Sequence, residues 1–165
     1  MAIEIERKFL VDVDLLTQSG ALVDAKRIAI SQAWLSRSDD ADGNKGATVR
    51  VRIAGNDAFL TIKGKTTGIS RSEFEYPIPL SDAQQLMQMC IGHTITKTRH
   101  VISVKNHLWE VDEFHGIHQG LWLAEIELRE EHEHFNKPPW LGKEVSQDAR
   151  YRNSVLALQT LAGDD

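Results

Sequence analysis

The 165-residue sequence has little of what stabilises exported or membrane proteins. It contains one cysteine, Cys90, and four prolines. One cysteine excludes an internal disulfide and favours a reducing compartment. No run approaches the roughly 20 apolar residues of a membrane-spanning helix, and the N-terminus lacks the apolar segment of a signal peptide. We therefore expect a cytoplasmic protein with no membrane partner.

The sequence also lacks a basic surplus. Lysine and arginine number 19 against 24 aspartate and glutamate residues, which gives a net charge of −5. Proteins that coat nucleic acid carry an excess of basic residues, so we predict no nucleic-acid partner. The length predicts one domain, residues 1–165, with an ordinary globular balance of apolar and charged residues.

The hydrophobic patterns predict a mainly β, α+β protein. Helices are expected at 12–19, 82–90 and 147–162. Asp12 is a plausible N-cap of the first, and Ser81 with Gln84 forms a capping-box pattern before the second. Strands are expected at 3–10, 27–36, 47–54, 57–65, 71–79, 97–104, 107–114 and 121–129. Eight short sequential strands favour an antiparallel sheet that closes into a barrel and thereby removes its edges.

Charged residues alternate with apolar ones along almost every predicted strand. Side chains two residues apart share a face, so each strand has one charged face. Such a face on a single strand usually means a solvated surface. Here the charges are also grouped by sign, although like charges side by side repel each other. The acidic pairs are Glu4/Glu6, Glu110/Asp112 and Glu125/Glu127, and the basic ones are Arg50/Arg52, Lys63/Lys65 and Lys97/Arg99.

This grouping predicts a barrel whose charged face points inward. A charged interior is unfavourable unless ions or a ligand fill it. Clustered carboxylates suit a hard divalent cation such as Mg²⁺ or Mn²⁺, and clustered Arg and Lys suit phosphate oxygens. Together they are the equipment for hydrolysing a phosphoanhydride. The apolar faces would then point outward, where the helices could cover them.

The charged motifs follow one another in the order of a known family. They include Glu4-Ile5-Glu6-Arg7-Lys8, which looks like an ExExK signature, Gln32-Ala33-Trp34-Leu35, Val49-Arg50-Val51-Arg52, Ser70-Arg71-Ser72-Glu73-Phe74-Glu75, Glu110-Val111-Asp112 and Glu125-Ile126-Glu127. The chain resembles the short, stand-alone bacterial members of the CYTH superfamily, the triphosphate tunnel metalloenzymes, from residue 3 to about 158. The resemblance implies an eight-stranded antiparallel tunnel barrel and a triphosphatase that depends on Mg²⁺ or Mn²⁺.

The resemblance also implies roles for individual residues. Metal-site acids would be Glu4, Glu6, Glu110, Asp112, Glu125 and Glu127. Binders of a small-molecule triphosphate would be Lys8, Arg50, Arg52, Lys63, Arg71, Lys97, Arg99 and, near the tunnel mouth, Arg150. Catalytic roles would fall to Glu4, Glu6, Lys8, Glu73 and Asp112. Trp34 departs from the tyrosine of many relatives, so a phenolic contact to substrate is absent there.

Inorganic tripolyphosphate, cleaved to pyrophosphate and phosphate, is the substrate that we expect. Thiamine triphosphatase and class IV adenylyl cyclase are the alternatives, although we find no residue set specific for adenine and ribose. A non-catalytic sensor of polyphosphate or nucleotide is a further alternative. Such a sensor could dispense with the carboxylates, all of which this chain retains.

Overall fold

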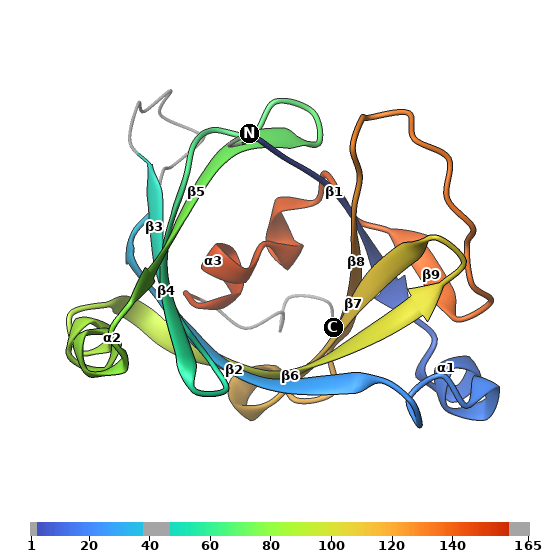
Figure 1. Cartoon of the computed structure of the whole chain (residues 1–165), viewed down its shortest axis with the longest axis horizontal. Helices are drawn as coiled ribbons and strands as arrows, with labels where there is room; N and C mark the ends of the chain where they lie inside the picture. The colour runs from blue at the N-terminus through green and yellow to red at the C-terminus, as the bar shows by residue number, and fades with distance from the viewer. Residues whose placement is uncertain (1–2, 38–46, 159–165) are drawn as a thin grey trace.

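The computed structural model describes residues 3–37 and 47–158, and its main feature is a closed ring of eight antiparallel strands (Figure 1). The strands are β1 (Ile3–Val11), β2 (Lys26–Ser36), β3 (Thr48–Ala54), β4 (Asp57–Lys63), β5 (Ser70–Ile78), β6 (Ile91–Val104), β7 (His107–Phe114) and β8 (Trp122–Glu127). Their order round the ring is β1-β5-β4-β3-β2-β6-β7-β8, and β8 returns to β1. The predicted eight-stranded antiparallel barrel is confirmed.

The first strand, β1, closes the ring. Its residues 3–5 pair with β5, and its residues 6–10 pair with β8. The end of β1 also pairs with a short ninth strand, β9 (Leu141–Glu144), through Phe9 and Val11. β9 is not among the strands predicted from the sequence, because four residues are too few to establish an alternating pattern.

Two tight hairpins fix the register of the central strands. β3 and β4 are joined by Gly55-Asn56, and β6 and β7 by Lys105-Asn106. Both loops place a positive φ at the first position, 59° at Gly55 and 55° at Lys105. Two-residue loops of this kind match the twist of antiparallel strands and set which residues face each other. The register in turn decides which side chains point into the barrel.

The first two helices lie outside the ring. α1 (Val13–Ser19) begins after Asp12, whose side chain accepts a hydrogen bond from the Leu15 backbone N–H, as predicted. α2 (Leu80–Met87) begins after Pro79 without a side-chain cap, so the predicted capping box at Ser81 was wrong. Pro79 already has the extended backbone of an N-cap, with φ −60° and ψ 140°, and the helix therefore starts earlier than Ser81 would allow.

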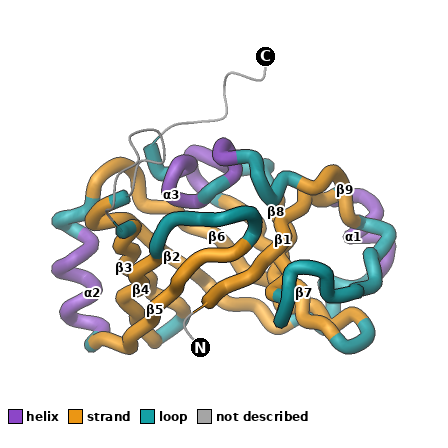
Figure 2. The backbone as a smooth tube through the Cα atoms, turned by 90° about the horizontal axis from the view of Figure 1, so that it is seen from above, coloured by secondary structure: helices purple, strands orange, loops and turns teal. Residues whose placement is uncertain are grey.

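The C-terminal segment differs from the single helix predicted at 147–162. It forms a short 3-10 helix, η3 (Ala149–Tyr151), and one turn of α-helix, α3 (Asn153–Leu156). Arg152 separates them because its backbone is extended, with φ −69° and ψ 131°. Residues 159–162 of the predicted helix lie outside the described residues. In Figures 1 and 2 this segment lies across one end of the barrel.

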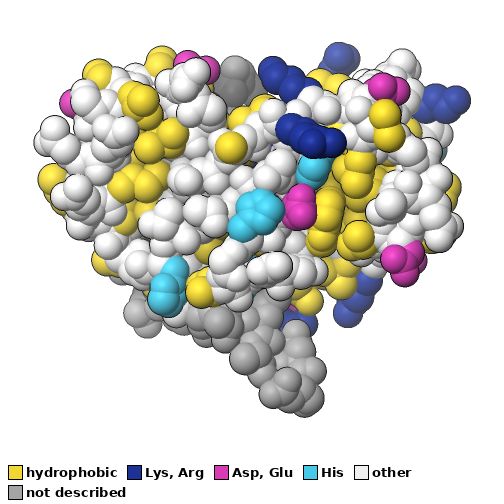
Figure 3. Space-filling view, turned by 90° about the horizontal axis from the view of Figure 1, so that it is seen from below, with side chains coloured by type: hydrophobic (Ala, Val, Ile, Leu, Met, Phe, Trp, Pro, Cys, Tyr) yellow, Lys and Arg dark blue, Asp and Glu magenta, His cyan; other side chains and the backbone are white. Residues whose placement is uncertain are grey.

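Much of the hydrophobic core lies outside the barrel wall, as the inward charges require. The largest cluster packs α1 and the chain after β8 against the outer faces of β1, β6, β7 and β8. Its buried members are Phe9, Leu16, Ile102, Trp109, Val111, Ala124, Ile126, Leu128, Phe135 and Trp140. α2 covers β3 and β4 through the fully buried Ala83. On the outer face shown in Figure 3, charged side chains are scattered among hydrophobic and uncharged ones.

A further apolar cluster lies at the barrel end that η3 and α3 cover. Its buried members are Trp34, Ile95, Phe114, Leu123, Val145, Tyr151, Leu156 and Ala157. A 3-10 turn, η2 (Gly116–His118), adjoins it, and His118 Nε2 lies 2.6 Å from the Leu156 carbonyl oxygen. Among the described residues, no helix has the length and hydropathy needed to cross a membrane.

Candidate active site

A cavity of about 270 Å³ occupies the interior of the ring. Every strand of the ring contributes at least one inward side chain to the wall of the cavity. β1 contributes three, namely Glu4, Glu6 and Lys8. Among the described residues, seven carboxylates and eight lysine or arginine side chains line the cavity. The acidic ones are Glu4, Glu6, Glu73, Glu75, Glu110, Glu125 and Glu127, and the basic ones are Lys8, Arg50, Arg52, Lys63, Arg71, Lys97, Arg99 and Arg152.

The carboxylates gather where β1 meets β8. The register sets Glu6 directly opposite Glu127, and Glu125 follows two residues away on the same face of β8. Like charges opposite each other destabilise a sheet. Burial, with repulsion from Glu125 and Glu4, raises the pKa of Glu6 well above its usual range. No described residue donates a hydrogen bond to the Glu6 side chain. These carboxylates therefore fit a site that is completed by a cation.

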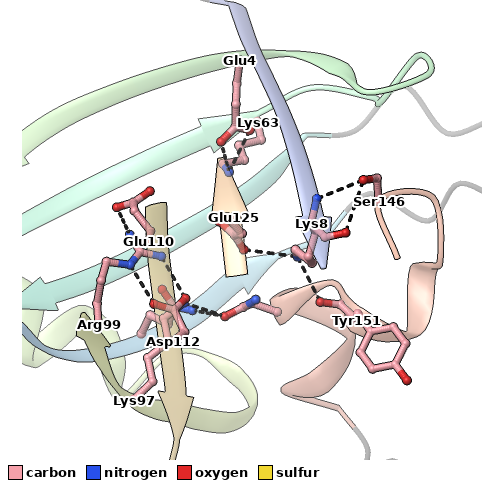
Figure 4. Close-up of polar contacts among 12 residues, drawn as sticks. Glu4, Lys8, Lys63, Lys97, Arg99, Glu110, Asp112, Glu125, Ser146 and Tyr151 are labelled. Atoms are coloured by element: carbon pink, nitrogen blue, oxygen red, sulfur yellow. Dashed lines mark hydrogen bonds and ion pairs between the residues drawn. The ribbon is translucent and has the colours of Figure 1, made fainter. Parts of the chain in front are cut away.

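The Lys63 ammonium from β4 extends into this acidic group. Its Nζ lies 3.1 Å from Glu4 Oε2 and 3.4 Å from Glu73 Oε2 (Figure 4 shows the Glu4 contact). Burial opposes ionisation of Glu4, but the neighbouring Lys63 charge holds the pKa of Glu4 below its usual value. Within the described part of the chain, no three carboxylates converge as a ready-made metal site. Lys63 instead acts as the local counter-charge.

Lys8 connects the acidic group to the C-terminal segment. Its ammonium lies 3.4 Å from Glu125 Oε1 and donates to the Tyr151 carbonyl oxygen at 3.0 Å (Figure 4). The Lys8 backbone N–H also donates to Ser146 Oγ at 2.9 Å. Burial disfavours the Glu125 carboxylate, yet Lys8 and then Lys97 lower the pKa of Glu125 far below its usual value. Glu125 is thus held as a carboxylate in the cavity wall.

Asp112 lies behind the cavity wall and organises two bases (Figure 4). Its Oδ2 accepts from Lys97 Nζ at 2.7 Å, and its two oxygens accept from Arg99 Nε and Nη2 at 2.8 and 3.0 Å. The other side of Arg99 reaches Glu110 at 2.8 Å. Because Asp112 is fully buried and both its oxygens are occupied, the structure places it as a support for Lys97 and Arg99.

Arg50 and Arg71 carry buried donors with no partner. Arg50 Nη2 donates to Thr61 Oγ1 at 3.1 Å and lies 3.7 Å from Glu75. The Nε atoms of Arg50 and Arg71 are buried and form no hydrogen bond within the described structure. A buried unsatisfied donor is unfavourable and usually marks a missing partner. Both side chains line the cavity, so a bound anion could supply acceptors.

The structure brings the predicted site residues together with two exceptions. Asp112 is one, since it lies behind the wall. Arg150 is the other: its guanidinium pairs with Asp148 at 3.0 Å, its side chain is half exposed, and it does not line the cavity. Arg152, Asn153 and Ser154 line the cavity instead. None of the three was predicted, because the pattern of their segment indicated a packing helix.

Comparison with known proteins places the chain in a family. A family model described as the CYTH domain matches residues 2–155. An inorganic triphosphatase of Acetivibrio thermocellus is 40% identical over 157 residues, which are 94% of this chain and 94% of that protein. One of Nitrosomonas europaea is 34% identical over 158 residues, with shares of 94% and 97%.

The solved structures agree. The crystal structure of an inorganic triphosphatase matches with a TM-score of 0.64 at 30% identity, covering 96% of this chain and 97% of that one. With its closed antiparallel barrel and charged interior, the chain belongs to the CYTH domain family. The resemblance inferred from the charged motifs is confirmed. Divalent-metal dependence is general among the triphosphatases of this family.

Proposed function

We propose that this chain is a triphosphatase that hydrolyses inorganic tripolyphosphate to pyrophosphate and phosphate. The observation that carries the proposal is the cavity itself, in which basic side chains from several strands surround one enclosed space beside a group of carboxylates. Triphosphates are long, highly charged anions, and several separate arginines and lysines suit successive phosphates. The two inorganic triphosphatases that match nearly the whole chain support the same activity.

The basic side chains bind and neutralise the substrate. Arg50, Arg52, Arg71 and Arg99 can donate paired hydrogen bonds to phosphate oxygens, while Lys8, Lys63 and Lys97 act as point charges. Phosphoryl transfer is accelerated chiefly by positioning and by charge neutralisation in the transition state. Glu73 lies beside Lys63, and burial raises the pKa of Glu73. We assign Glu73 the role of orienting the attacking water.

The carboxylates fit a divalent cation, Mg²⁺ or Mn²⁺. Glu4, Glu6, Glu125 and Glu127, with Glu110 nearby, provide the oxygen ligands that these hard cations prefer. The half-buried Glu6 carboxylate, to which no described residue donates a hydrogen bond, is the observation that favours them. When bound, the cation would neutralise phosphate charge and lower the pKa of water. Lys63, which now compensates Glu4, is then free to contact a phosphate.

The lining of the cavity favours an inorganic substrate over an organic one. Among the described lining residues, Trp34 is the only aromatic side chain, and it is 3% exposed and packed in an apolar cluster. A nucleotide base or a thiamine ring therefore finds no stacking surface there.

The test is phosphate release from tripolyphosphate, ATP and thiamine triphosphate, each with Mg²⁺, Mn²⁺ or chelator. Pyrophosphate and cyclic AMP are assayed in parallel. We expect fast, metal-dependent cleavage of tripolyphosphate to pyrophosphate, with slower release from the other two. A better organic substrate would overturn the choice of tripolyphosphate. Tight binding of all three without turnover would overturn the enzymatic function and indicate a sensor.

A further inference from the structure

A chain of hydrogen bonds at the covered end of the cavity joins two amides to two bases. Arg52 Nε donates to Gln32 Oε1 at 2.8 Å, and Gln32 Nε2 donates to Asn153 Oδ1 at 2.7 Å. The Lys97 ammonium donates to the same Asn153 oxygen at 2.9 Å. Two neutral side chains thus connect β3 and β6 through β2 and α3.

Both polar atoms of the Gln32 amide take part in this series of hydrogen bonds. The Gln32 side chain has no exposed surface, and both ends of its amide are hydrogen-bonded. The β2–β3 register sets it directly opposite Arg52. A buried amide is unfavourable unless it is hydrogen-bonded, so the position of Gln32 is tied to the positions of its partners. Moving Gln32 would therefore move the Arg52 guanidinium.

Several bases elsewhere in the cavity pair directly with carboxylates. Lys8 pairs with Glu125, and Arg99 pairs with Glu110 as well as with Asp112. A carboxylate fixes a base but also cancels its charge. Such pairs are therefore rigid, and less of their positive charge remains for a ligand.

The positive charges of Arg52 and Lys97 are compensated less completely by carboxylates. Arg52 forms no ion pair with any described carboxylate, and Lys97 shares the single carboxylate of Asp112 with Arg99. An amide oxygen accepts a hydrogen bond without carrying a net charge. Burial, with repulsion from Arg50 and Arg99, lowers the pKa of Arg52, which agrees with an excess of positive charge here.

We propose that Gln32 and Asn153 are positioning residues that direct Arg52 and Lys97 into the cavity without adding a further negative charge there, so that positive charge remains for an anion. The inference rests on the proposed function, because the anion is then the phosphate end of the triphosphate. A carboxylate at either amide position would pair with the base that it touches and compete with phosphate. An apolar side chain would leave that base without its acceptor.

The sharpest variant is Asn153→Asp, which keeps the acceptor oxygen and the shape and adds one negative charge. We expect tripolyphosphate to bind about tenfold more weakly, measured by calorimetry in chelator. With Mg²⁺, KM should rise correspondingly while kcat stays within about threefold. Unchanged affinity, or a fall in kcat at unchanged KM, would overturn the proposal. Asn106→Asp, in an exposed hairpin turn, is the control of equal net charge.

Gln32→Glu is the second isosteric variant, judged by the same affinity criterion if Asn153→Asp does not fold. Failure of both to fold would make the amides structural elements and would overturn the proposal. Binding in chelator requires no turnover, so the two hypotheses can fail separately. A wild-type protein that binds tripolyphosphate without cleaving it contradicts the proposed function, and the affinities of the variants still decide the inference.

Discussion

The barrel interior contains two regions that the same strands build from opposite kinds of residue. Along β1 the inward Glu6 and Lys8 are followed by Leu10, and along β7 the cavity-lining Glu110 is followed on the same face by the buried Asp112 and then by Phe114. The alternation continues, but the side chains change from charged to apolar. The charged part lines the cavity, and the apolar part packs against the C-terminal segment.

This contrast separates stability from function along the barrel. The apolar end buries Leu156 and Tyr151, and such burial is the main favourable term in folding. The charged part gathers like charges, such as Glu6 opposite Glu127, and leaves donors without partners. Such an arrangement is costly in the free protein and becomes favourable when a ligand fills it. Substitutions in the charged part should therefore lower activity more than stability, and substitutions at the apolar end should lower stability more than activity.

The largest effect on turnover is expected from Glu6→Gln. Removing this carboxylate should lower metal-dependent turnover on the order of a thousandfold. The melting temperature should stay the same or rise, because burial and neighbouring carboxylates already disfavour the charged form of Glu6. Phosphate release and thermal melting measure the two effects. Glu130→Gln, at an exposed position, is the control, and full activity of Glu6→Gln would refute the metal assignment.

Arg52→Ala should come next. Loss of a charge-assisted contact should weaken tripolyphosphate binding by about tenfold to a hundredfold. The affinity for pyrophosphate, which has one phosphate fewer, should fall less if the basic strands contact successive phosphates. Calorimetry with both ligands measures the difference, with the exposed Arg27→Ala as the matched control. Equal losses for the two ligands would contradict this order of contacts.

A smaller effect is expected from pH. Burial outweighs the neighbouring Asp112 and lowers the pKa of Lys97 to about 7. Lys97 is then charged below pH 7 and loses its proton as the pH rises through 7. Tripolyphosphate affinity in chelator should therefore fall by up to about tenfold between pH 6 and pH 8. Tripolyphosphate itself also titrates, so Lys97→Met serves as the reference that shows the contribution of the ligand alone. An identical pH profile in this variant would exclude Lys97 as the cause.

The smallest effect on turnover is expected at the apolar end. Leu156 is fully buried, so Leu156→Ala should lower the free energy of unfolding by about 2–5 kcal/mol. Well below its melting temperature, the variant should keep kcat within about fivefold, because Leu156 does not line the cavity. Denaturant unfolding and steady-state kinetics test both statements. Leu158→Ala, at a partly exposed position, is the control, and a loss of kcat without a loss of stability would abolish the contrast.

The sequence predicted the barrel and the charged character of its interior because a period of two assigns each side chain to a face. The period alone does not show how far along the barrel a side chain lies, or whether it reaches the cavity or stays buried behind the cavity wall. Asp112 and Glu110 share a face, yet only Glu110 lines the cavity. The helical pattern after residue 147 likewise concealed the extended Arg152, whose backbone conformation places Arg152 rather than Arg150 at the cavity. Both differences in position arise from tertiary packing that no local pattern encodes.

The most direct test of the central claim is a crystal structure with Mn²⁺ and tripolyphosphate, in which anomalous scattering locates the metal. We expect Mn²⁺ beside Glu6 and phosphate groups beside Arg52 and Lys97, all inside the barrel. Tripolyphosphate bound on the outer surface, or a metal site remote from the inward carboxylates, would contradict it.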